Sequence, residues 1–160
     1  MSITKRWIGL LLVLCLLLSV VPVTANAVTA SGTCGDNLTW SLSDDGVLMI
    51  SGSGPMTNYY SNKGSPWSSF STITSVVIGD DVTTIGNYAF NECTNLTSVE
   101  IGDSVTTIGH FGFFSCDSLT SVVIPDSVTT IGDQAFTGCN SLTSVEIGDT
   151  VTIIGNVAFW

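Results

Sequence analysis

Few side chains in this 160-residue sequence could carry nucleophilic chemistry. His110 is the single histidine, and Cys116 follows it closely. A Cys–His nucleophile pair requires a thiolate in a partly exposed pocket. The internal repeat described below instead places Cys116 in an apolar column, and His110 in a polar column otherwise holding Asn87, Asp133 and Asn156. We therefore expect no catalytic residues and a protein that is not an enzyme.

Cys93, Cys116 and Cys139 recur at a constant spacing of 23 residues. If successive repeats stack as neighbouring strands, these positions lie about 5 Å apart, a separation that does not exclude a disulfide. Three thiols in one column cannot all pair, however, and an inward orientation favours buried free thiols that act as small apolar groups. Cys34 stands alone, and no four ligands converge as a zinc site requires. We expect no metal and no cofactor.

An acidic column is the remaining candidate for chemistry. Asp80, Asp103, Asp126 and Asp149 occupy the same position in four successive repeats. A ladder of calcium sites is one interpretation, but one carboxylate per turn supplies few of the six to eight oxygens that calcium takes. We favour the alternative, in which each Asp caps its turn through local backbone hydrogen bonds.

These residues are positioned by an internal repeat, which is the strongest pattern in the sequence. Units begin at Ser75, Ser98, Ser121 and Ser144, each 23 residues after the last, and the first reads SVVIGDDVTTIGNYAFNECTNLT. Such a repeat is typical of solenoids, in which stacked units enclose apolar columns that one unit cannot bury alone. The predicted core columns are Val76, Val99, Val122 and Val145; Ile78, Ile101, Ile124 and Ile147; Val82, Val105, Val128 and Val151; Ile85, Ile108, Ile131 and Ile154; Phe90, Phe113, Phe136 and Phe159; and Leu96, Leu119 and Leu142.

The spacing within a unit predicts its local structure. Leu96, Val99 and Ile101 end in the period-two alternation of a strand with one buried face, so stacked units form a parallel sheet. Gly102-Asp103 then turns the chain. We predict one helical or 3₁₀ turn around Ala89-Phe90. The small residue before each Phe is expected to allow close approach between coils: Ala89, Gly112, Ala135 and Ala158.

We divide the chain into a signal peptide (1–27), an N-terminal β-hairpin cap and loop (28–66), and a solenoid (67–160). The solenoid comprises a half-repeat at 67–74, repeats at 75–97, 98–120 and 121–143, and a truncated unit at 144–160. In the cap, Leu38, Trp40 and Leu42 alternate before the turn Asp44-Asp45-Gly46, which predicts a hairpin. Residues 52–66 are rich in Gly, Ser, Pro and Asn and are expected to form a surface loop.

The first 27 residues have the pattern of a secretory signal peptide. Lys5 and Arg6 precede an apolar run from Trp7 to Val21, and Ala25-Asn26-Ala27 provides small residues for cleavage. The run is short for a membrane span, so we expect secretion and no stable membrane insertion after cleavage. Only Lys63 among the three basic residues lies beyond residue 27, with all 13 acidic residues, leaving a formal net charge of −12. This charge disfavours nucleic acid as a partner.

The unit L-T-S-V-x-I-P/G-D-S-V-T-T-I-G-x-x-A-F-x-x-C resembles the BspA-like bacterial leucine-rich repeat. The stretch from Cys34 to Gly54 resembles the segment that often precedes those repeats. The resemblance implies a mainly β, right-handed leucine-rich-repeat solenoid with parallel strands, short helical or 3₁₀ turns and an N-terminal β-hairpin cap. It also implies a secreted or cell-surface protein that binds a protein or glycan ligand, such as a host surface or matrix component.

Two surfaces are candidates for that binding. Outward positions of the parallel sheet form the first, because solenoids bind through such extended faces; they are Val77, Ser98, Glu100, Ser121, Val123, Ser144 and Glu146. These may equally be solvent-facing residues that merely suit a sheet. An aromatic edge of Tyr88, Phe111 and Phe114 is the second, and its side chains could instead cover a neighbouring coil. The alternative function is a structural stalk, or an accessory module of a larger wall-associated or glycan-active protein, here truncated.

Overall fold

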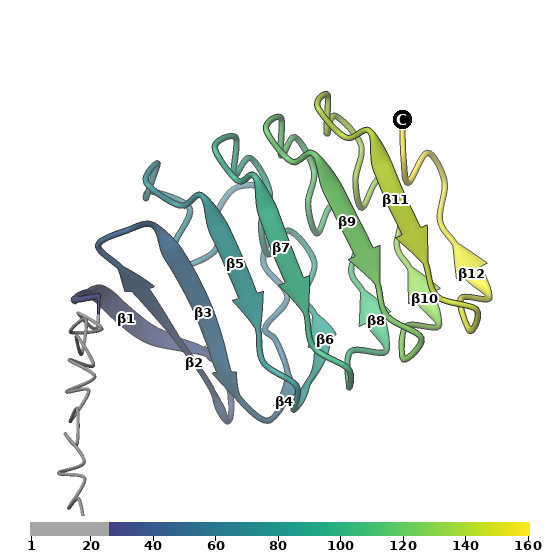
Figure 1. The fold of residues 1–160 in the computed structure, drawn as a ribbon. Coiled ribbons are helices and arrows are strands. Elements are labelled where there is room, and N and C mark those ends of the chain that lie inside the picture. The colour runs from purple at the N-terminus through teal and green to yellow at the C-terminus, as the bar shows by residue number, and fades with distance from the viewer. Residues whose placement is uncertain (1–25) are drawn as a thin grey trace, which may run out of the picture.

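The computed structural model describes residues 26–160, in which the chain winds through four successive coils that carry two stacks of parallel strands (Figure 1). The predicted signal peptide falls almost wholly on residues 1–25, outside the described part. Each coil contributes one strand to a main sheet and one to a second sheet. The main-sheet strands are β5 (Ser75–Ile78), β7 (Ser98–Ile101), β9 (Ser121–Ile124) and β11 (Ser144–Ile147); the second-sheet strands are β6 (Val82–Ile85), β8 (Thr107–Ile108), β10 (Thr130–Ile131) and β12 (Ile153–Ile154).

The repeat fixes the register, since equivalent residues of successive coils lie side by side. Val76 pairs with Val99 in the main sheet, and Ile85 pairs with Ile108 in the second. The predicted apolar columns face inward between the sheets, although four of their members in the last described coil are exposed by 36–52%: Val145, Ile147, Ile154 and Phe159. The Phe column is a continuous stack, with Phe90, Phe113 and Phe136 buried and ring centroids 5.0 and 5.1 Å apart. The solenoid predicted from the repeat is therefore confirmed.

The two sheets differ in continuity. The second sheet runs unbroken through the strands β4, β6, β8, β10 and β12, whereas the main sheet is interrupted between β7 and β9. At the interruption Val99 is only half-buried, while Val76 and Val122 of the flanking coils are buried. The same coils are thus joined tightly on one side and more loosely on the other.

Three antiparallel strands of the main sheet form the cap. The expected hairpin consists of β2 (Leu38–Ser43) and β3 (Val47–Gly52), and β3 continues into the solenoid by pairing in parallel with β5. An additional strand, β1 (Val28–Gly35), covers the free edge of β2. Trp40 packs edge-on against Trp67 at 5.9 Å, and Trp67 stacks on Phe90, so aromatic side chains close the core where the regular coils begin.

The predicted helical or 3₁₀ turn is wrong, because residues 26–160 contain no helix. The segment before each Phe column is a string of turns. The amides of Tyr88, Phe90 and Glu92 donate to carbonyls of the next coil, at 3.0, 2.7 and 2.8 Å. Tyr88 and Glu92 adopt positive φ angles of 54° and 60°, which turn alternate N–H groups outward along the solenoid. The intervening amides of Ala89, Asn91 and Cys93 still bond carbonyls three residues back, so bonds between coils alternate with bonds within one coil and no continuous helix forms.

The predicted surface loop over residues 52–66 is also partly wrong. It contains the short strand β4 (Gly54–Pro55), which begins the second sheet, and it buries Met56 and Ser65. Composition indicated a loop because Gly, Ser and Pro are frequent, but long-range pairing with β6 orders its first part. Among the described residues, no helix is long and apolar enough to cross a membrane.

Candidate functional site

The outer face of the main sheet holds the first predicted binding surface. Its middle row runs in register through Ser41, Met49, Val77 and Glu100, and continues on the next strand pair as Val123 and Glu146. A parallel row holds serines, in which the Ser98 hydroxyl lies 3.1 Å from that of Ser75. All seven predicted face residues point outward, and Val77 alone is half-buried.

Most side chains of this outer face are short, because they are Ser, Thr or Val. Val123 and Met49 expose 58% and 45% of their surface, which is unusual for apolar residues of a sheet. The acidic Glu100 and Glu146 alternate with valines along the solenoid. The face therefore offers apolar contacts between negative charges.

The predicted aromatic edge is assembled on the turn segments. Tyr88 stacks on Phe111 at 4.6 Å with nearly parallel rings, and Phe111 contacts Phe114 at 5.5 Å. The structure brings all three together, as predicted. Phe111 and Phe114 are half-buried, so the rings cover a neighbouring coil while leaving part of their edges in solvent.

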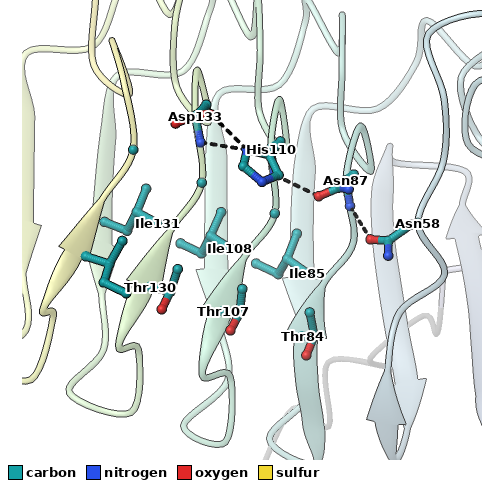
Figure 2. A pocket seen from close by; sticks show the side chains of 14 residues that line it. Asn58, Thr84, Ile85, Asn87, Thr107, Ile108, His110, Thr130, Ile131 and Asp133 are labelled. Atoms are coloured by element: carbon teal, nitrogen blue, oxygen red, sulfur yellow. Dashed lines mark hydrogen bonds and ion pairs between the residues drawn. The ribbon is translucent and has the colours of Figure 1, made fainter.

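A groove across the second sheet was not foreseen from the sequence. It has a volume of about 350 Å³ and runs over all four coils, from Asn58 to Gly155. Figure 2 shows three parallel rows in it: a polar ladder, a row of isoleucines, and a row of threonines. The threonine row consists of Thr84, Thr107 and Thr130, which pair in register on β6, β8 and β10.

The polar ladder of the groove joins one coil to the next through side chains. Asn58 Oδ1 accepts from the amide of Asn87, Asn87 Oδ1 from the amide of His110, and His110 Nδ1 from the amide of Asp133, at 2.8, 2.8 and 2.9 Å. Asp133 Oδ1 accepts from the amide of Asn156 at 2.7 Å. Because His110 Nδ1 accepts a hydrogen bond, this arrangement places the ring proton on Nε2.

Glycines let the coils approach closely along this ladder. A Cβ on Gly132 would lie 2.6 Å from the amide nitrogen of His110, and one on Gly109 would lie 2.7 Å from that of Asn87. No side chain fits at either position without moving backbone. The small residue before each Phe is less constrained, since a Cβ on Gly112 would meet nothing nearer than 3.1 Å.

All four described cysteines are free thiols; Cys34, Cys116 and Cys139 are buried and Cys93 is half-buried. Burial raises the pKa of Cys34 to about 11 and that of Cys93 to about 12. A hydrogen bond to Cys139, together with burial, raises the pKa of Cys116. The Cys116 thiol donates to the carbonyl of Phe90 at 3.2 Å. These thiols have little thiolate character near neutral pH.

His110 lies close to a carboxylate. His110 Nδ1 is 3.6 Å from Asp133 Oδ2, and both side chains are about half exposed. Cys116, the nearest thiol in sequence, faces the core. In the described part of the chain, no three His, Cys, Asp or Glu side chains gather as metal ligands do.

Asp126 of the acidic column bonds differently from the prediction. We expected each Asp to cap its own turn, but Asp126 Oδ1 accepts from the amide of Asp149 in the next coil at 2.9 Å. The carboxylate thus links coils, as the polar ladder does. The 23-residue spacing contained this signal, because a polar column in a solenoid lies beside itself in the next coil.

The comparisons with known proteins agree with this architecture. The model of the BspA type leucine rich repeat region matches residues 67–160 in six copies. Among curated proteins, none matches. A leucine-rich repeat protein from Eubacterium ventriosum is 26% identical with a TM-score of 0.56, over 80% of this chain and 45% of that protein.

Two further solved structures are similar. The T. pallidum leucine rich repeat protein is 26% identical with a TM-score of 0.56, over 79% of this chain and 65% of that one. A Bacteroides ovatus leucine-rich repeat protein is 32% identical with the same TM-score, over 67% and 28%. The chain thus spans less than two thirds of the length of each of these relatives. With the repeat, the stacked strands and a family match over residues 67–160, the chain belongs to the BspA type leucine-rich repeat family.

Proposed function

We propose that the chain is a secreted or cell-surface binding protein, without catalytic activity, that engages a protein ligand through the outer face of its main sheet. Leucine-rich repeats of this family are typically scaffolds for binding. The proposal does not depend on the groove of the second sheet.

The observation that carries the proposal is the exposed row from Met49 to Glu146. It extends from the cap across the coils without a bulky side chain, so a partner can contact several coils at once. Val123 is the most exposed apolar residue of this row, at 58%. Apolar residues surrounded by short polar ones are typical of a contact surface.

An array of extracellular matrix and serum proteins tests the proposal, with the whole chain as the soluble probe. We expect saturable retention by at least one protein. Val123→Asp should weaken that binding at least about tenfold, because a carboxylate would be buried in the contact. Ser104→Asp adds the same charge at an exposed turn away from the face, and should leave binding unchanged. Equal effects of the two variants, or no retention on the array, would contradict the proposal.

Secretion is tested separately. The first described strand, β1, begins at Val28, directly after the predicted cleavage site, so removal of residues 1–27 would leave the cap whole. We expect a chain expressed with residues 1–27 to reach the medium or cell surface with Val28 as its first residue. N-terminal mass spectrometry measures this. An uncleaved chain would contradict it.

A further inference from the structure

Two threonine columns stand next to each other in the second sheet, and only one of them has a partner inside the protein. In the first column, the hydroxyls of Thr106, Thr129 and Thr152 each donate to the carbonyl of the equivalent threonine one coil earlier, at 3.2, 3.2 and 3.3 Å. This column holds the coils together. Each of these hydroxyls already donates a hydrogen bond within the protein.

The second column is the threonine row of the groove: Thr84, Thr107 and Thr130. Within the described residues these hydroxyls make no hydrogen bond to protein, although each lies on a paired strand. They are half-buried, and they face the same groove (Figure 2). The fold does not require a hydroxyl at this position, since Ile153 occupies it in the last described coil.

The opposite wall of the groove carries polar atoms that the ladder leaves free. Each ladder side chain uses one atom to accept an amide of the next coil, which leaves the Nδ2 group of Asn87, Nε2 of His110 and Oδ2 of Asp133 for other partners. Successive coils repeat these groups at about 4.8 Å, the spacing of neighbouring strands. Donors and acceptors therefore line both walls.

The floor between the two walls is apolar and low. It lies over the buried isoleucines Ile85, Ile108 and Ile131 and over Gly109 and Gly132, where no side chain fits, and its exposed apolar side chain is Ile153, at 56%. A ligand must therefore be flat, must present polar groups along both edges, and must have an apolar face. Its size is limited by a volume of about 350 Å³, near the lower end for small-molecule sites.

We propose that this groove binds a short neutral oligosaccharide lying along the solenoid axis, across the coils. A sugar ring has hydroxyls around its edge and C–H groups on its faces, which matches the hydroxyl and amide walls and the exposed side chain of Ile153. The net charge of −12 beyond residue 27 disfavours a phosphorylated, sulfated or uronic acid ligand. Backbone groups of the second sheet are already paired between coils, so a peptide could not add as a strand there.

The matched threonine columns provide the test. The whole chain is titrated with cello-, chito- and manno-oligosaccharides of two to six sugars, by calorimetry. Thr107→Val and, separately, Thr130→Val remove a groove hydroxyl while keeping the shape of the side chain. Thr106→Val removes a hydroxyl that bonds the preceding coil. Melting temperatures of all variants are measured alongside.

We expect at least one of these series to bind, and Thr107→Val and Thr130→Val to weaken binding about tenfold or more with unchanged melting temperature, because each leaves a sugar hydroxyl unpaired. Thr106→Val should lower the melting temperature and keep the affinity. The groove assignment is overturned by no binding of any series, or by equal losses of affinity in the Thr106→Val and Thr107→Val chains. Because Val123→Asp lies on the main sheet, it should not affect sugar binding, which separates this proposal from the previous one.

Discussion

The two sheets of this solenoid are built from the same coils, yet they are held together differently. In the second sheet, the glycine after each of the strands β8, β10 and β12 donates its N–H to the preceding coil: Gly109 to Ile85, Gly132 to Ile108 and Gly155 to Ile131, at 2.8–2.9 Å. Side-chain ladders of threonine and of polar residues run beside these bonds. In the main sheet, the pairing stops between β7 and β9.

Pro125 offers a physical reason for the interruption. At two other junctions of the main sheet the residue after the strand is a glycine whose N–H bonds the preceding coil, as in Gly79 to Ile50 and Gly148 to Ile124. Proline has no N–H to donate. The second-sheet strands of the repeats contain no proline. Side-chain hydrogen bonds between coils also supplement their backbone pairing. The comparison teaches that a solenoid tolerates a break on one side when ladders secure the other.

The largest effect should come from blocking close approach in the second sheet. Gly132→Ala would place a Cβ 2.6 Å from the amide nitrogen of His110, so the coils must separate. We expect a loss of about 3 kcal/mol in the free energy of unfolding, measured by urea denaturation. Gly112→Ala is the matched control, because two other full repeats carry Ala there, Ala89 and Ala135, and it should change stability little. Similar losses in both variants would show that the close approach of the coils at Gly132 is not especially important for stability.

The second prediction tests whether water is excluded from the core between the two sheets. Burial raises the pKa of Cys34 to about 11 and that of Cys93 to about 12, from an ordinary value of 9.0. Well below pH 9 both thiols are protonated in the folded and in the unfolded chain, so the free energy of unfolding does not depend on their titration there. As the pH rises above 9, only the unfolded chain loses protons, and stability falls.

We therefore expect the urea midpoint under reducing conditions to be steady up to about pH 8 and to fall as the pH rises from about 9 toward about 11. The fall should be smaller in the double variant Cys34→Ala and Cys93→Ala, which lacks both thiols. An unchanged fall in that variant would mean that these thiols are solvated in the native state. The coupled pair of Cys116 and Cys139 remains in both chains and cancels in the comparison.

Much of this molecule could be predicted from its sequence because the repeat gives each column four independent observations. The inward columns, the hairpin of the cap and the buried thiols followed from spacing and alternation. The turn segment at Ala89-Phe90 did not, because local sequence cannot show that Phe90 donates to Gly112 of the next coil. The pairing of β1 and of β4 could not be predicted either, because these strands lie outside the repeat and each pattern occurs only once in the sequence.

The candidate sites divide in the same way. The outward face of the main sheet followed from alternation, since a strand with one buried face exposes the other. The groove did not, because Thr83 and Thr84 are the same residue type in neighbouring positions. Only the structure separates them, through the bond that the column of Thr83 makes and the column of Thr84 lacks.

The third prediction repairs the main sheet. Pro125→Gly restores an N–H at the position that bonds the preceding coil elsewhere, and we expect β7 and β9 to pair. The gain of a hydrogen bond is offset in part by the greater freedom of glycine in the unfolded chain, which leaves about 1 kcal/mol or less. Hydrogen exchange of the β9 amides should slow. Gly148→Pro should do the reverse between β9 and β11. Unchanged exchange in Pro125→Gly would show that the proline is not the cause.

The fourth prediction weakens the ladder of the second sheet without touching its backbone. Asn87→Ala removes the oxygen that accepts from the amide of His110 at 2.8 Å. Because that amide can be solvated in part, we expect a loss of about 1 kcal/mol and faster exchange at the His110 amide. Asn95→Ala is a control, since its side chain bonds the carbonyl of Ser71 on the turn side of the coil. It should leave exchange at His110 as it was.

The smallest effect concerns the turn segments that join the two sheets. Glu92 and Ser115 hold positive φ angles of 60° and 54°, and the third coil has Gly138 at the equivalent position. A left-handed conformation costs a residue with a side chain about 1 kcal/mol, whereas glycine adopts it freely. Part of this strain is balanced by the entropy that glycine loses on folding, so Glu92→Gly should stabilise the chain by about 0.5 kcal/mol. Gly138→Glu should destabilise it by a similar amount. If both substitutions destabilise, the turns are held by side-chain packing of the coils, and the backbone conformation carries no strain to relieve.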